Sequence, residues 1–74
     1  MIRLDNLSPG QFGIVAKLSG SVRVKKYEKM GLRPGMKIYC RYRSPGGSVT
    51  VLEVGDRILA FRNRDLRHIL VEPL

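Results

Sequence analysis

Two side chains are the natural candidates for covalent chemistry in this sequence: the one cysteine, Cys40, and the one histidine, His68. A nucleophile needs a base within hydrogen-bond reach. Cys40 falls on the apolar side of an alternating run, where a thiol behaves as a small hydrophobic group. His68 stands near the start of an apolar run, where an imidazole is usually solvated or caps a turn. We therefore expect Cys40 in the core, no catalytic residue, and a protein that is not an enzyme.

The spacing of metal-binding residue types argues against a metal site within one chain. A structural zinc site takes about four cysteine and histidine ligands, usually in close pairs, and this chain has one of each. Harder ions prefer carboxylates, but the six acids are scattered without a ligand rhythm. We predict no metal ligands and no cofactor in one chain, and a site shared between two chains stays open.

A phosphate-binding loop is the chemistry that a glycine-rich stretch could offer, and residues 44–48 read Ser-Pro-Gly-Gly-Ser. Phosphate loops lead from a strand into a helix, and one common form ends in Gly-Lys followed by Ser or Thr. Here the stretch joins two alternating runs, and no lysine follows. The stretch therefore indicates a hairpin.

Positive charge is concentrated in one third of the chain. The formal net charge is +8, and between Ser21 and Arg43 eight basic residues stand against the single acid Glu28, which gives +7. Such a field attracts an acidic protein surface, a nucleic acid or an anionic membrane. The alternative is a solvated face that keeps a small protein soluble.

Short alternating runs separated by Pro-Gly and Gly-Gly turns are the elements that must position these residues. The run 12–18 predicts a strand in which Phe12, Ile14, Ala16 and Leu18 share one face. The segment 22–30 favours a short helix that Ser21 caps and Gly31 ends, although Val22 and Val24 could continue a strand.

The run 36–43 carries the basic stripe. Met36, Ile38, Cys40 and Tyr42 alternate with Lys37, Tyr39, Arg41 and Arg43. Because successive side chains of a strand point to opposite faces, we expect Tyr42 inside with Cys40. The basic residues and Tyr39 then lie on the solvent face.

Further strands are predicted over 49–54, 58–61 and 69–71, with a helical turn from Asn63, as its cap, to Arg67. Five short strands, one inserted short helix and a terminal helical turn predict a mostly β fold, a small five-stranded barrel rather than a sandwich. A chain of 74 residues has room for one core, so we expect one domain over residues 1–74.

Three features bear on location. No apolar run approaches the roughly 20 residues that span a bilayer, the opening segment has a charge at Asp5 and no apolar stretch of a signal peptide, and one cysteine allows no internal disulfide. We expect a cytoplasmic protein without direct membrane insertion.

The order of these features resembles the FeoA family of bacterial ferrous-iron uptake. Residues 27–35 read YEKMGLRPG, and residues 30–35 are similar to the family's Met/Leu-Gly-Leu-x-Pro-Gly helix exit. The resemblance also includes Pro9-Gly10, the Pro-Gly-Gly hairpin at 45–47 and the run Ile58–Arg62, and it extends from Leu4 to Val71. Tyr27 stands where the family commonly has leucine, and Leu66 where a small alanine is usual; we interpret both as repacked core positions.

This resemblance implies an SH3-like β-barrel and an accessory role in Fe(II) import without catalysis. It also implies a partner, the FeoB-type membrane transporter with its cytoplasmic GTP-binding domain. A similar domain ends metal-dependent transcriptional repressors, so a basic nucleic-acid-binding or regulatory domain is the alternative function. Transition-metal binding is sometimes attributed to the family, and this sequence offers no ligand set for it.

The first hypothesis is therefore an interaction module. It assigns partner binding to the basic residues of the charged segment and to one aromatic anchor: Arg23, Lys25, Lys26, Lys29, Arg33, Lys37, Tyr39, Arg41 and Arg43. Specific nucleic-acid binding is not expected, because one exposed aromatic, Tyr39, is a poor stacking platform. Homo-oligomerisation through Tyr39, Leu52 or Val54 is the third hypothesis.

Overall fold

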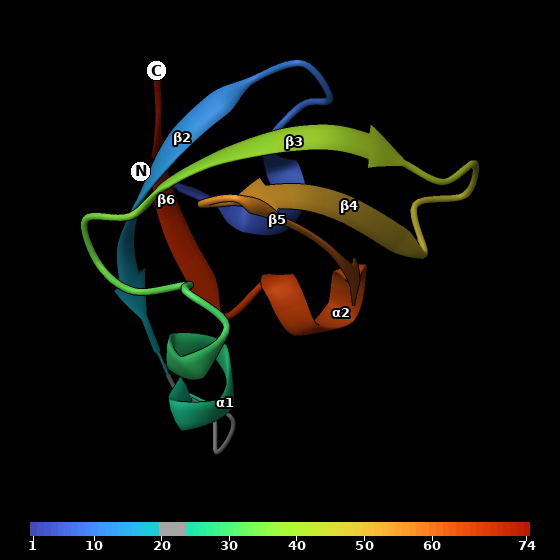
Figure 1. Ribbon diagram of the computed structural model, residues 1–74. Coiled ribbons are helices and arrows are strands. Elements are labelled where there is room, and N and C mark those ends of the chain that lie inside the picture. The colour runs from blue at the N-terminus through green and yellow to red at the C-terminus, as the bar shows by residue number, and fades with distance from the viewer. Residues whose placement is uncertain (20–23) are drawn as a thin grey trace.

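The computed structural model describes residues 1–19 and 24–74, with the backbone alone at Val24 (Figure 1). Its strands and helices follow one another in short pieces. In chain order they are β1 (Ile2–Arg3), the 3-10 helix η1 (Leu4–Asn6), β2 (Phe12–Leu18), α1 (Val24–Lys29), β3 (Lys37–Arg43), β4 (Val49–Val54), β5 (Arg57–Arg62), α2 (Asn63–Leu66) and β6 (Ile69–Pro73).

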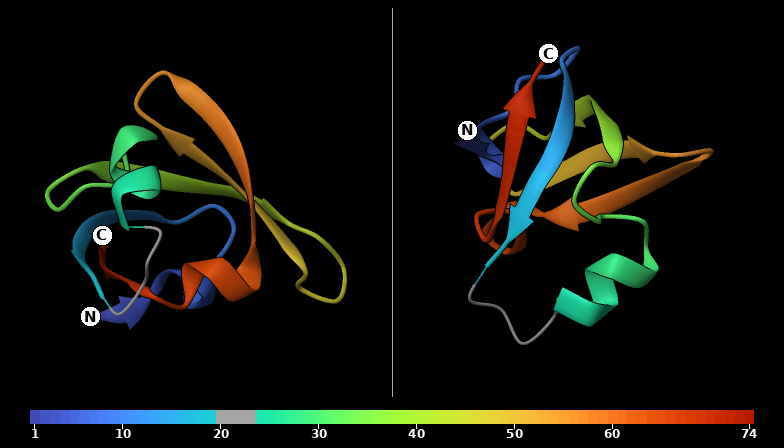
Figure 2. Two further views of the ribbon diagram at one scale, coloured as in Figure 1. Left: turned by 90° about the horizontal axis from the view of Figure 1, so that it is seen from below. Right: turned by 90° about the vertical axis from the view of Figure 1, so that its left-hand side faces the viewer.

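The strands form one antiparallel sheet in the order β1-β6-β2-β3-β4-β5. The mostly β fold with one inserted helix and a late helical turn is confirmed, but the count of five strands is wrong. The two residues of β1 pair with β6 and were too short to predict. Among the described residues no pairing joins β1 to β5, so closure of the expected barrel is not observed. Figure 2 shows the sheet strongly curved, with the β4–β5 hairpin running across the β2–β6 pair.

Turn chemistry sets the strand boundaries. Gly55 has φ +64° and is followed by Asp56 with negative φ, which is the arrangement of a two-residue type II′ hairpin turn between β4 and β5. Pro34 and Gly35 occupy the centre of a turn in which the Met36 N–H donates to the Arg33 carbonyl at 3.0 Å. The predicted turns and the strand 49–54 are therefore confirmed.

The helix α1 ends as its sequence predicts. The N–H of Leu32 donates to the carbonyl of Tyr27 at 2.9 Å, and the N–H of Gly31 donates to Glu28 at 3.0 Å, while Gly31 has φ +98°. This pair of bonds is the Schellman motif, which requires a left-handed residue and therefore favours glycine. The predicted cap, Ser21, lies outside the described residues.

The side chains of β2 and β3 depart from the expected alternation, and each strand contains a β-bulge. In β2 the buried residues are Gly13 and Val15, Phe12 is 44% exposed, and the register shifts between Val15 and Lys17. In β3 the register shifts between Cys40 and Tyr42. A bulge inserts an unpaired residue and reverses the alternation beyond it, so the expectation that Tyr42 lies inside is wrong. Phe12 precedes the bulge of β2 and lies outside because the buried face of this strand is the one that carries Gly13 and Val15, so the face predicted to hold Phe12 and Ile14 was the wrong one to bury.

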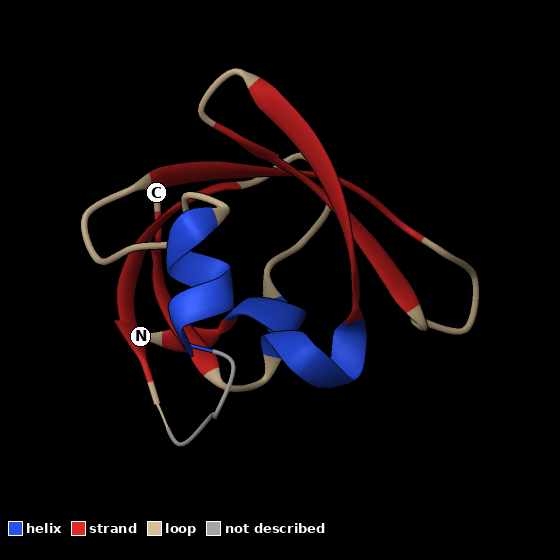
Figure 3. Cartoon of the chain, turned by 60° about the horizontal axis from the view of Figure 1, so that its bottom comes forward, coloured by secondary structure: helices blue, strands red, loops and turns tan. Residues whose placement is uncertain are grey.

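The core lies in the concave side of the sheet and beneath the helices, which Figure 3 shows gathered at one end of the molecule. Tyr27 and Leu66 are buried there, which confirms them as core positions, and their neighbours include Leu4, Leu32, Leu52, Val54, Phe61 and Ile69. Cys40 is fully buried, and that burial raises the pKa of its thiol. Asn63 does not cap α2: the cap residue is Arg62, without a side-chain cap bond, and Asn63 accepts a hydrogen bond from Thr50 instead.

Candidate partner-binding surface

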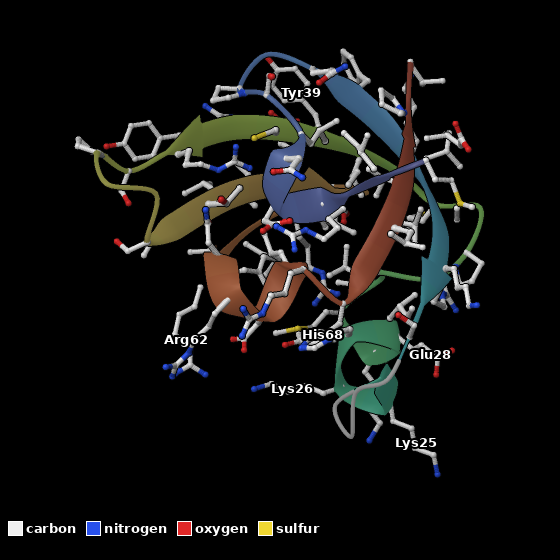
Figure 4. The ribbon with its side chains drawn as sticks, turned by 180° about the vertical axis from the view of Figure 1, so that it is seen from behind. Lys25, Lys26, Glu28, Tyr39, Arg62 and His68 are labelled. Carbon is white, nitrogen blue, oxygen red and sulfur yellow. The ribbon has the colours of Figure 1, made fainter. Side chains whose placement is uncertain are left out.

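Three of the predicted basic residues lie on α1 and project into solvent. Lys25, Lys26 and Lys29 are all exposed, and Figure 4 shows Lys25 and Lys26 directed away from the body of the protein. Since α1 buries Tyr27 against the core, the residues on its other sides must be solvated. Arg23 lies outside the described residues.

A shallow depression brings part of this charge together. Lys25 and Lys29, four residues apart on one helix face, line it with Glu28 and with Arg33 from the turn after the helix. We call Lys25, Lys29 and Arg33 the basic helix cluster. Arg57 of β5 joins its edge, because its guanidinium donates to the Met30 carbonyl at 2.9 Å and lines a second depression together with Lys29 and Arg33.

An aromatic groove lies on the outer side of β2 and β3. Phe12 and Tyr39 are cross-strand partners whose ring centroids are 4.6 Å apart, and Lys37 Nζ lies 4.6 Å from the centroid of the Phe12 ring. The two rings are tilted by 46° to each other, and aromatic and cation–π contacts of this kind stabilise the arrangement of their side chains. The groove measures about 330 Å³ and is lined by Phe12, Met36, Lys37, Ile38, Tyr39, Glu53 and Gly55.

The basic helix cluster and the aromatic groove adjoin. Met36 and Gly55 line both the aromatic groove and the depression that holds Lys29, Arg33 and Arg57. Five predicted site residues, Lys25, Lys29, Arg33, Lys37 and Tyr39, therefore line adjoining depressions, and Arg41 is connected to them through its ion pair with Glu53. Lys26 is exposed but lines none of these depressions.

The last two arginines of the predicted stripe have partners within the protein. Arg41 is half-exposed and pairs with Glu53, with Nη1 and Oε2 3.0 Å apart. Arg43 turns back after the bulge, donates from Nε to the Thr50 hydroxyl at 2.9 Å, and buries its Nη2 atom. The assignment of Arg43 to the solvent face is therefore wrong, because the bulge at Arg41 changes its direction.

Sequence reasoning missed Phe12, and one signal could have found it. A Cβ atom at Gly13 would lie 3.3 Å from the Glu72 carbonyl oxygen, so the inward position next to Phe12 accepts only glycine without displacement. The signal in the sequence is the glycine itself, because a glycine inside a strand marks a close approach of another backbone. Gly13 therefore faces inward, and its neighbour Phe12 faces outward.

The observed exposure of these residues also bears on the hypotheses of nucleic-acid binding and self-association. Specific nucleic-acid binding was not expected because only one aromatic side chain was predicted to be exposed, but Phe12 and Tyr42 are 44% and 52% exposed. Leu52 and Val54 are buried, so neither can form the self-association patch that the sequence suggested.

Covalent chemistry has no support in the described part of the chain. Cys40 is enclosed by the core, and His68 is a half-buried residue whose carbonyl accepts a bond from the Ser19 N–H at 2.9 Å (Figure 4). Within residues 1–19 and 24–74 no three His, Cys, Asp or Glu residues are grouped to hold a metal ion. In the same residues no helix is long and apolar enough to cross a membrane.

Comparisons with known proteins agree on one family. A family model for the FeoA domain matches residues 2–73. A crystal structure of an iron uptake regulatory protein (FeoA) is 27% identical, with a TM-score of 0.86 over 99% of this chain and 96% of that protein. An NMR structure of a FeoA-like protein from Clostridium acetobutylicum is 27% identical, with a TM-score of 0.88 over 99% and 86%.

A more distant structure identifies the fold. Zinc-complexed FeoA from Stenotrophomonas maltophilia has a TM-score of 0.84 at 17% identity, over 97% of this chain and 91% of that protein. It is described as an SH3 domain protein and as a candidate activating factor of bacterial ferrous iron transport. At this identity the likeness establishes the SH3-like fold alone. No curated protein is significantly similar in sequence.

Proposed function

This chain belongs to the FeoA family, and from that premise we propose that it is a cytoplasmic accessory protein of ferrous-iron uptake. It acts as a single interaction domain over residues 1–74, docks on the cytosolic GTP-binding domain of a FeoB-type transporter, and catalyses no reaction itself. The observation that carries the proposal is the junction of the basic helix cluster with the aromatic groove at Met36 and Gly55.

Each half of this surface supports a different part of docking. Exposed lysines and arginines steer an acidic partner and raise the association rate. Phe12 and Tyr39 supply apolar area with few rotatable bonds, which lowers the entropy cost of binding. Charge would therefore govern the encounter, and the aromatic groove the lifetime of the complex.

The test uses two charge-reversed variants with the same change in net charge. Lys29→Glu with Arg33→Glu alters the basic helix cluster, and Lys17→Glu with Arg67→Glu alters two exposed basic residues that line none of the depressions described above. Calorimetric titration against the transporter's purified cytosolic domain at low salt should give at least about tenfold weaker binding for the first pair. The second pair should change it little.

Three outcomes would count against the proposal. Equal weakening by both pairs would mean that only net charge matters, and unchanged affinity of the first pair would remove the basic helix cluster from the interface. Failure of the wild-type protein to bind the domain would overturn the function itself. Thermal unfolding of all variants confirms that the fold is kept.

A further inference from the structure

The strand β5 has one open side. Among the described residues it pairs with β4 alone, at the end of the sheet. The two-residue turn makes Val54 and Arg57 a hydrogen-bonded pair, and such pairs alternate along an antiparallel ladder. The main-chain groups of Arg57, Leu59 and Phe61 therefore face β4, and those of Ile58 and Ala60 face away from it.

The outer face beside this edge is mostly apolar and carries several exposed side chains, with Glu53, paired to Arg41, as its one acid among the described residues. The register places Ile58 opposite Glu53, Glu53 opposite Tyr39, and Tyr39 opposite Phe12, so the four form one row across the sheet. A second row runs from Ala60 through Val51 to Tyr42. Of the five large hydrophobic residues that are exposed in the described part of the chain, three lie in these rows: Phe12, Tyr42 and Ile58, the last 59% exposed.

An open edge next to an apolar face is the geometry of strand addition. An incoming extended segment takes its affinity from main-chain bonds to the edge, and its specificity from alternate side chains on the sheet face. Proteins usually blunt such edges because they recruit other chains. Here Ile58 and Ala60 carry no charge or proline to blunt it.

The charges at the two ends of β5 indicate which charges an incoming segment would carry. At one end, Arg57 shares a depression with Lys29 and Arg33, and the acids Glu28 and Asp56 also line it. At the other end, Arg62 pairs with Asp65 and shares a depression with Arg64. Arginine therefore flanks the apolar centre on both sides. A second copy of this chain would bring another net charge of +8 to the same place, which disfavours self-pairing.

We propose that the open edge of β5 binds an extended segment of a partner protein as an added strand, with apolar residues at its centre and acidic residues at its ends. The centre lies along Ile58 and Ala60, and the acids lie toward Arg57 and Arg62. The inference rests on the proposed function only for the identity of the partner.

The first experiment uses synthetic peptides in place of the partner. The probe is a ten-residue peptide with alternating valine and threonine at its centre and two glutamates at each end. One control carries N-methyl groups on alternate central amides, which blocks main-chain bonding without changing the side chains. The other control has lysine in place of glutamate. Both controls should bind at least about tenfold more weakly than the probe.

Amide exchange measured by NMR locates the binding. The probe should slow exchange of the Ile58 and Ala60 amides, the two that face the open side. Ala60→Pro removes one of these donors from an edge strand, where proline is tolerated, and should weaken binding of the probe. Ala60→Val keeps the donor and should bind as the wild type does.

Other modes of binding at this edge would give different results in these experiments. Equal binding of the N-methylated peptide, or no binding at millimolar concentration, would overturn strand addition. Two other results would also overturn it. Slower exchange of the Ile58 and Ala60 amides as the protein concentration alone rises would indicate that a second copy of the chain binds the edge. Slower exchange of the same amides on addition of an oligonucleotide would indicate a nucleic acid. If the transporter domain binds wild type and Ala60→Pro equally, this inference fails and the proposed function stands.

Discussion

The buried hydroxyl of Thr50 connects a strand to a helix through two polar side chains. It accepts a hydrogen bond from Arg43 Nε at 2.9 Å and donates one to the side-chain oxygen Oδ1 of Asn63. Thr50→Val keeps the shape but leaves both neighbours without this partner, and should lower the free energy of unfolding by about 1–3 kcal/mol. Urea denaturation measures the loss. Thr50→Ser, which keeps the hydroxyl, should lose clearly less, and equal losses would mean that packing alone matters.

The Cys40 thiol makes stability depend on pH in the alkaline range. Burial raises the pKa of this thiol above its ordinary value of 9.0, so above that pH the unfolded chain loses the proton while the folded chain keeps it. Stability is therefore fully present below pH 9 and falls as the pH rises above it, by at most about 1.4 kcal/mol per pH unit.

The measurement is urea denaturation of wild type and Cys40→Ala between about pH 7 and 10. Cys40→Ala is less stable throughout, because it leaves a cavity. Its deficit should shrink above pH 9, since the wild type alone has the thiol to ionise. A constant deficit would show that the Cys40 thiol does not titrate differently on unfolding.

Single residues mark the limit of what alternation can predict. The burial of Cys40 and the exposure of Lys37 and Arg41 were predicted correctly from period two. Arg43 and Tyr42 were not, because the β3 bulge depends on pairing with β4, and pairing is a tertiary property. Local sequence carries the period but not the point at which it is interrupted.

At the scale of elements, the end of α1 combines a backbone requirement with a close contact. Gly31 has φ +98°, and a Cβ there would lie 3.0 Å from Val54 Cγ1 in the core. Gly35 has nearly the same conformation, φ +92°, with nothing within 4 Å. Gly35→Ala should cost about 1–2 kcal/mol from the left-handed backbone alone, and Gly31→Ala about 1–3 kcal/mol more from crowding. Equal losses in urea denaturation would mean that Val54 gives way freely.

Turn residues explain why the elements were largely predictable. Pro34-Gly35 and Gly55-Asp56 mark their turns because proline fixes φ and glycine accepts a positive φ. The strand 37–43 begins after the first turn, and the strands 49–54 and 57–62 flank the second. The two residues of β1 have no such signal, since they form a strand only because β6 lies beside them. The sheet order is likewise a long-range property.

The whole molecule brings together parts of the candidate surface that the sequence keeps apart. The basic helix cluster was visible as a charge run, but its junction with Phe12 depends on β2 pairing with β3 and on the Gly55 turn reaching the end of α1. No local pattern contains that information. The composition predicted a basic surface, but the sheet topology determines which residues lie on it.

Net charge also predicts a background attraction to nucleic acids that differs from the proposed docking. Binding of a generic single-stranded oligonucleotide through about four phosphates should weaken about fiftyfold between 50 and 200 mM salt, because affinity follows counterion release. Phe12→Ala with Tyr42→Ala should leave this binding unchanged, since phosphate contacts need no aromatic ring. Fluorescence anisotropy measures both. If binding persists at the higher salt and the double variant loses it, bases stack on the outer face, and the open sheet face serves a nucleic acid instead of a protein.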